Sequence, residues 1–268
     1  MRTMLRAYVV PALAALHAGP APAPAAPSSV PEQPRVALAH AHYDRSSRAL
    51  FAERGMAYPP RALLLRGFKR ERVLELWAGA SDEPGTRLTL VKTFPICAMS
   101  GALGPKRREG DGQVPEGFYT VSGFNPASAF HLSMRISYPN ASDRAIHRAE
   151  HSSPSLGGDI FIHGGCVTVG CLPLGDDAIE ELYTIAHDAH EAWKAPIAVH
   201  LFPTRLDDSA VDVLARAHRS DPATVARWRN LKQGYDAFQR SHSLNVIRID
   251  TAGNYRFSSR PALHRSRG

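Results

Sequence analysis

Short apolar runs separated by Gly, Pro and charged residues fill the middle of this chain, and their length is that of β-strands. A helix of a globular protein would need a periodic pattern of about ten residues or more, which these runs lack. The runs are Leu63–Leu65, Val73–Trp77, Leu88–Val91, Phe118–Val121, Phe130–Ile136, Asp159–His163 and Ile197–Leu201. We therefore expect a β-rich core, with the stretch Ser100–Gly117, dense in Gly, Pro and charge, as a long ordered loop.

Helical patterns lie mostly outside this core. Asp177 with Glu180 three residues later is typical of a capping box and predicts a helix start, followed by an apolar stripe on which His190 falls as a core histidine. Further expected elements are helices at Ser47–Arg54, Ser209–His218 and Ala223–Ser241, and a hairpin of Val246–Ile249 with Tyr255–Phe257. The predicted fold class is mostly β, with one inserted helix, plus an α-rich C-terminal extension.

The N-terminus has the three parts of a secretory signal. Arg2 and Arg6 precede a short apolar run, and an A-x-A site follows at Ala23–Ala25. We expect residues 1–25 to be a signal peptide and the protein to be exported, to the periplasm or the cell envelope. Pro11 interrupts the apolar run, so an uncleaved anchor stays open, although no stretch reaches the roughly 18 apolar residues of a spanning helix.

Three further segments are expected after the signal peptide. Residues 26–60 are interpreted as a linker with a short helical lead-in, because residues 26–42 are rich in Pro, Ala and Ser. Residues 61–204 hold the strand-like runs, and residues 205–268 form the helical extension, which ends in a basic tail at Arg260–Arg267.

The net charge of +7 favours an anionic partner. We do not expect nucleic acid, because the chain looks exported and no aromatic residues alternate with the basic ones to stack on bases. An anionic polymer of the cell envelope fits this charge better.

The residues most typical of catalysis lie in the segment DIFIHGGCVTVGCLPL, which begins at Asp159. A predicted strand ends at His163, and Cys171 follows eight residues later, after a Gly-rich loop. A free thiol is only a few per cent ionised at neutral pH, so a cysteine nucleophile needs a base such as imidazole. Gly170 allows a sharp turn that exposes main-chain N–H groups, as an oxyanion hole requires. The segment indicates acyl chemistry with Cys171 as nucleophile and His163 as base.

Two alternatives stay open for these residues. Cys171 could be an inert buried thiol, since free Cys is commonly a small core residue. His131, His163, Cys166 and Cys171 could instead ligate zinc, although their spacing matches no common zinc finger or ribbon. We expect neither a metal nor a cofactor.

The same segment resembles the L,D-transpeptidase catalytic domain family, the YkuD domain, and most closely its YafK-like branch. The family signature is His-Gly followed by [Ser/Thr]-x-Gly-Cys, which matches His163-Gly164 and Thr168-Val169-Gly170-Cys171. Further blocks extend the resemblance over roughly residues 61–257. They are Ser100–Lys106, Glu109–Gln113, Pro115–Tyr119, His131–Asn140 and Trp228–Phe238.

The resemblance implies a sandwich-like YkuD core, with residues 61–204 as the catalytic domain. Cys171 would be the nucleophile and His163 the proton acceptor, while Gly164, Thr168 and Gly170 would shape the site. The loop Ser100–Gly117 would be a lid or brace near the site. Four residues of the matching blocks are expected to bind substrate: Glu116, His131, Tyr138 and Asn140.

The implied substrate is a peptidoglycan stem peptide containing diaminopimelate, attacked at its third residue to give a thioester. An amine acceptor then makes a crosslink or attaches a lipoprotein, and water makes a hydrolase. Pro173 and Val169 replace the Arg or Asn and the His that are common in the wider family. The alternatives are a YafK-like amidase that releases lipoprotein from the wall, and a non-catalytic wall- or metal-binding module.

The chain has three cysteines, so one is left over if two of them pair. With export assumed, an oxidising compartment would allow a disulfide. We hypothesise that Cys97 pairs with Cys166 and leaves Cys171 free. A bridge between Cys166 and Cys171, which would silence an enzyme, is the alternative.

Overall fold

The computed structural model describes residues 34–83, 85–150 and 155–258, and this part of the chain forms one compact unit. Its helices are α1 (Pro34–Ala52), α2 (Ala141–Ala149), α3 (Asp176–Trp193), α4 (Asp208–Ala217) and α5 (Pro222–Ser241). Its strands are β1 (Ala62–Phe68), β2 (Val73–Gly79), β3 (Thr89–Pro95), β4 (Gly117–Asn125), β5 (Ser133–Ile136), β6 (Phe161–His163), β7 (Leu172–Pro173), β8 (Ala198–Phe202), β9 (Val246–Ile249) and β10 (Tyr255–Ser258). The predicted signal peptide, residues 26–33 and the basic tail lie outside the described residues.

Eight of the strands form one mixed sheet in the order β3-β2-β1-β8-β4-β5-β6-β7, and β9 pairs with β10 in a separate hairpin. Every residue of β1 is buried, because β1 pairs with β2 on one side and with β8 on the other and both of its faces are covered. The sheet curls where β4 leaves β8 and pairs with β5, at a register shift between Val121 and Gly123. The predicted fold class is confirmed: a mostly β core, an inserted helix between β7 and β8, and an α-rich extension.

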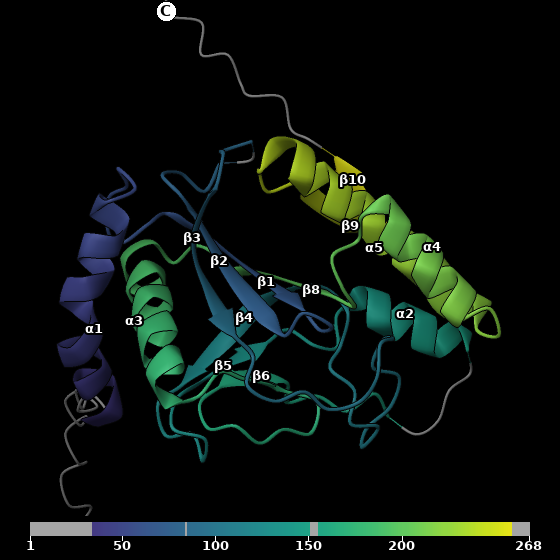
Figure 1. The fold of residues 1–268 in the computed structure, drawn as a ribbon, viewed down its shortest axis with the longest axis horizontal. Helices are drawn as coiled ribbons and strands as arrows, with labels where there is room; N and C mark the ends of the chain where they lie inside the picture. The colour runs from purple at the N-terminus through teal and green to yellow at the C-terminus, as the bar shows by residue number, and fades with distance from the viewer. Residues whose placement is uncertain (1–33, 84, 151–154, 259–268) are drawn as a thin grey trace, which may run out of the picture. The chain divides into compact units, whose positions relative to one another are not determined.

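Helices cover the sheet from two sides, with α1 and α3 on one side and α4 and α5 on the other (Figure 1). The extension is held by a cluster in which Trp228 and Leu231 of α5 pack with Phe68, Phe118 and Phe202 of the sheet. No helix among the described residues is long and apolar enough to cross a membrane.

A buried ion pair fastens the extension to the sheet. The carboxylate of Glu116, which is fully buried, accepts hydrogen bonds from Nζ of Lys69 at 2.9 Å and from Nε1 of Trp228 at 2.7 Å. It also accepts one from the backbone N–H of Gly104. These bonds join the turn after β1, helix α5 and the long loop after β3, so the loop and the extension both depend on the Glu116 carboxylate.

Three helix predictions need correction. Helix α1 begins at Pro34, well before the expected start at Ser47, because Val36 and Ala39 form a buried face that Ala-rich sequence does not reveal. Helix α2 was not expected, and it is capped by Asn140 with Asp143 in a capping box.

The capping box predicted at Asp177 and Glu180 is wrong. Helix α3 begins at Asp176, and Gly175 is its N-cap with no side-chain cap. The strand expected from Phe130 is also shorter: β5 begins at Ser133, because His131 has a positive φ of 67° that a strand does not tolerate.

We predict that Glu116→Ala lowers the free energy of unfolding by about 3–5 kcal/mol, because it leaves the buried Lys69 cation with only the carbonyls of Gly104 and Val114 and without an anion. Urea denaturation followed by circular dichroism measures this change. The exposed pair of Lys194 and Glu191 is the matched control, and Glu191→Ala should cost less than about 1 kcal/mol. Equal losses for the two variants would contradict the structural role of Glu116.

Candidate active site

His163 lies at the end of β6 and is almost completely buried, at 1% exposure. Its backbone pairs with Ser133 of β5 on one side and Pro173 of β7 on the other, which fixes where the side chain begins. Nδ1 lies 2.5 Å from the carbonyl oxygen of Gly164. The ring of Phe130 packs on the imidazole, with the two ring centroids 4.8 Å apart. Because a carbonyl only accepts, Nδ1 carries the proton and Nε2 is left as a basic nitrogen.

Burial also decides the charge of this histidine. Desolvation lowers the pKa of His163, and the hydrogen bond to Gly164 opposes that shift. The imidazole is therefore neutral at pH 7 and able to take up a proton, which is the state that a general base needs.

Cys171 carries the free thiol, directly before β7. Its Sγ accepts a hydrogen bond from the backbone N–H of Phe161 at 3.4 Å and donates one to the carbonyl of Asp159 at 3.7 Å. Burial raises the pKa of the thiol, while the N–H of Phe161 and the positive charge of Lys106 act in the opposite direction. The resting cysteine is therefore protonated, and a base must remove the proton before it can attack.

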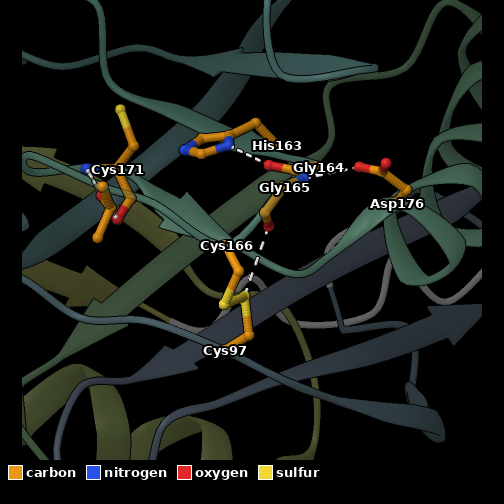
Figure 2. Close-up of a disulfide and its surroundings, with 8 residues drawn as sticks. Cys97, His163, Gly164, Gly165, Cys166, Cys171 and Asp176 are labelled. Atoms are coloured by element: carbon orange, nitrogen blue, oxygen red, sulfur yellow. Dashed lines mark hydrogen bonds between the residues drawn. A yellow bond between two sulfur atoms is a disulfide. The ribbon is translucent and has the colours of Figure 1, made fainter.

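His163 and Cys171 lie at the two ends of the Gly-rich loop, on paired strands: Ile162 of β6 lies opposite Leu172 of β7. Figure 2 shows the ring edge of His163 that is remote from Gly164 turned toward Cys171. The protonated nitrogen of the imidazole is on the side of Gly164, and the thiol of Cys171 donates to the carbonyl of Asp159 in this resting arrangement.

The main-chain N–H groups around the cysteine are not free, in contrast to the sequence expectation. Gly170 donates to Oγ of Ser100 at 2.6 Å, and Cys171 donates to Oγ1 of Thr168 at 2.9 Å. The Thr168 hydroxyl in turn donates to the carbonyl of Cys171. Both of the predicted oxyanion donors therefore already have hydroxyl acceptors in this structure.

Gly170 is required by its backbone. Its φ is 94°, and a Cβ added there would lie 3.0 Å from the carbonyl oxygen of Gln113. Gln113 belongs to the long loop after β3, which also contains Ser100. The hydroxyl of Ser100 donates to the carbonyl of Gly112 in that loop. The stretch Ser100–Gly117 therefore contacts the backbone beside the cysteine as a brace.

A disulfide holds the other end of the loop. Cys97 and Cys166 are bonded, with their Cα atoms 5.7 Å apart (Figure 2). The N–H of Cys97 also donates to the carbonyl of Pro173. This is the pairing hypothesised from the sequence. It removes Cys166 from the zinc alternative, because a disulfide sulfur is not a thiolate ligand.

Asp176 links the loop to α3, a role that the sequence analysis missed. Its Oδ1 accepts from the N–H of Gly165 at 2.7 Å (Figure 2). A Cβ added at Gly164 would lie 2.6 Å from that carboxylate, which explains why glycine follows the histidine. The negative charges of Asp176 and Asp177 in the first turn are the sequence signal for this role, but the same charges are also typical of a helix start.

The four residues expected to bind substrate have other partners. Nε2 of His131 donates to Oε1 of Glu180 at 2.7 Å. The segment of His131 lies beside His163, because the N–H of Gly164 donates to the carbonyl of Phe130. Tyr138 is buried and donates to the carbonyl of Leu156.

The side chains of Asn140 and Glu116 form their hydrogen bonds with other residues of the fold. Asn140 caps α2 and donates to the carbonyl of Phe118 and the hydroxyl of Tyr255. Glu116 is the buried carboxylate described above. The structure does not bring Glu116, Tyr138 and Asn140 to the site, because their polar atoms satisfy buried neighbours.

Comparison with known proteins agrees with this geometry. The family model "YkuD: L,D-transpeptidase catalytic domain" matches residues 72–197. The chain is 32% identical over 199 residues to the Escherichia coli (strain K12) protein named "Putative L,D-transpeptidase YafK", with 74% of each chain covered. The chain therefore belongs to the YkuD L,D-transpeptidase family, whose members act on peptidoglycan peptides in the cell envelope.

Solved structures give more distant matches. The helical cell shape determining protein Pgp2 of Campylobacter jejuni is 16% identical, with 76% of this chain and 80% of that chain covered and a TM-score of 0.42. L,D-transpeptidase 1 of Mycobacterium tuberculosis is 13% identical, with 53% and 62% covered and a TM-score of 0.28. Membership of the family rests on the sequence matches.

We predict that Cys171 in the folded protein is alkylated by iodoacetamide with a pH midpoint above that of the same residue in urea. The reason is that only the thiolate reacts, and burial raises the pKa of the folded thiol. Mass spectrometry of the labelled peptide over a pH series measures both midpoints. A midpoint in the folded protein at or below the unfolded one would refute the resting state described here.

We also predict that joint replacement of Cys97 and Cys166 by Ser lowers the free energy of unfolding by about 4 kcal/mol. The disulfide links two residues that are 69 positions apart. It lowers the chain entropy of the unfolded state, and this stabilises the folded state by about 4 kcal/mol. Denaturant unfolding with and without a reductant measures the loss. The Ser variant should be insensitive to the reductant, and an equal response of both proteins would contradict the prediction.

Proposed function

We propose that the protein is a cysteine-dependent L,D-transpeptidase that acts on peptidoglycan stem peptides through a thioester acyl-enzyme, in crosslinking or remodelling of the cell wall. The observation that carries this proposal is the state of His163. Its Nδ1 proton is held by the carbonyl of Gly164, which leaves the basic Nε2 for the thiol of Cys171.

In the first step, Nε2 of His163 takes the thiol proton and the sulfur attacks the carbonyl of the diaminopimelate residue, the third of the stem. A C–S bond forms and the carbonyl oxygen becomes an oxyanion. When the intermediate collapses, the C–N bond to the terminal D-amino acid breaks, and the imidazolium returns its proton to the leaving amine. The product is a thioester on Cys171.

In the second step, the amine of an acceptor peptide attacks the thioester and loses its proton to His163. The new amide is a crosslink, and the thiol is regenerated. Water in place of the amine gives a carboxylate and makes the protein a hydrolase. A wall-attached lipoprotein as the acyl substrate gives the amidase alternative through the same thioester.

The oxyanion would bind at the N–H groups of Gly170 and Cys171. Because these groups now donate to the hydroxyls of Ser100 and Thr168, the oxyanion would replace both hydroxyls as acceptor. A donor of this kind is worth roughly 3–4 kcal/mol in other acyl-transfer sites.

Export to the cell envelope is part of the proposal. The sequence features of a signal peptide support it, and so does the disulfide of Cys97 with Cys166, because such bonds persist in oxidising compartments.

The test incubates the protein with purified sacculi, with and without bound lipoprotein and an exchangeable D-amino acid. We expect loss of terminal D-alanine, new amide linkages and an acyl adduct on Cys171, detected by muropeptide analysis and intact-mass spectrometry. Cys171→Ala should abolish all three, and His163→Gln should slow them by about 10²–10⁴-fold. His147→Gln, a half-buried histidine of α2, is the matched control and should keep full activity.

Two other outcomes decide the alternatives. Cys171-dependent release of lipoprotein without a new linkage would establish the amidase. Sacculi left unchanged by the parent protein, with no adduct on Cys171, would lead us to abandon an enzymatic function.

A further inference from the structure

Three potential metal ligands converge between α1 and α3, and none of them takes part in the chemistry described above. His40 comes from α1, and His187 and Asp188 come from α3. One ligand atom from each lies within 4.8 Å of the others, and all three side chains are half-buried. They are therefore shielded by the two helices and still open to an ion from solvent.

The spacing of two of these ligands suits a tetrahedral ion. Nε2 of His40 lies 3.3 Å from Oδ1 of Asp188. Ligand atoms about 2.0–2.1 Å from a tetrahedral zinc are about 3.3–3.4 Å apart. The hydroxyl of Tyr58 donates to the other oxygen, Oδ2 of Asp188, at 2.7 Å, which orients the carboxylate and leaves Oδ1 toward His40.

Packing orients the third ligand. The ring of His187 stacks on Tyr183 with an interplanar angle of 12° and meets Phe124 and His40 edge-on. These contacts leave the imidazole little freedom to rotate, so ordering it around an ion costs little entropy.

We propose that His40, His187 and Asp188 bind one Zn²⁺ ion, which fastens α1 to α3. Two imidazoles and one carboxylate are a ligand set that zinc accepts, with water in the fourth position, whereas Mg²⁺ and Ca²⁺ prefer oxygen ligands alone. Helix α1 lies outside residues 72–197, so the site joins the family domain to a helix that precedes it.

The ion would stabilise more than the helix pair. Arg35 of α1 donates to the carbonyls of Ser128 and His131, at 2.7 and 2.8 Å. His42 of α1 and His131 bind the two oxygens of Glu180 on α3. The segment Ser128–His131, which α1 holds through these bonds, includes Phe130, whose ring packs on His163. A fixed α1 therefore supports this wall of the active site.

The test titrates ZnCl₂ into the untagged Cys171→Ala protein by isothermal calorimetry, so that the thiol cannot compete as a ligand. We expect one equivalent to bind and no heat from MgCl₂. His40→Gln, His187→Gln and Asp188→Asn should each weaken the affinity at least tenfold, while His147→Gln should leave it unchanged. Circular dichroism confirms that each variant is folded.

Thermal unfolding tests the fastening of α1. Zinc at about 100 times its dissociation constant should raise the melting temperature of the Cys171→Ala protein, the parent of the three ligand variants, by about 5–10 °C. It should leave the melting temperatures of the ligand variants unchanged. The proposal is overturned if the parent does not bind zinc, if the ligand variants bind as tightly as the parent, or if binding leaves the melting temperature unchanged.

Discussion

The connection between β6 and β7 is the constraint on which the active site depends. These strands are parallel, with His163 opposite Pro173, yet residues 164–171 alone join them. Parallel neighbours are ordinarily joined by a crossover of a dozen residues or more. So short a return needs positive φ angles, and Gly165 and Gly170 provide them at 61° and 94°. The same return places His163 and Cys171 on two paired strands, because β6 ends at the histidine and β7 begins directly after the cysteine.

Contacts from two other segments hold this loop in place, one directly after β3 and one at the start of α3. The disulfide from Cys97, the hydroxyl of Ser100 and the carboxylate of Asp176 each bind a different part of it. With the loop closed in this way, burial raises the pKa of Cys171 and lowers that of His163, so the resting pair is neutral. A neutral pair spares the fold a buried charge, and the proton can move when a substrate arrives.

Prediction from the sequence succeeded where the pattern is local. The strand runs, the inserted helix, and helices α4 and α5 were visible because apolar periodicity and turn residues mark them. Helix α1 was missed before Ser47, over residues 34–46, because only Val36 and Ala39 are buried there and they form no apolar stripe. Glu116, Tyr138 and Asn140 looked functional because a polar residue in a matching block has the same signature whether it contacts substrate or a buried neighbour. Only the structure shows the Lys69 and Trp228 donors that Glu116 satisfies.

The sequence by itself determined the chemistry that is available: one histidine and one cysteine joined by a Gly-rich loop, in a mostly β chain of a recognisable family. The tertiary structure alone decided which nitrogen of His163 is basic, which acceptors the N–H groups of Gly170 and Cys171 already have, and that His40 meets His187. The physical reason is the distance along the chain over which each kind of interaction acts. Turns, caps and periodicity act over a few residues, whereas burial, hydrogen-bond partners and ligand clusters depend on segments that only packing brings together.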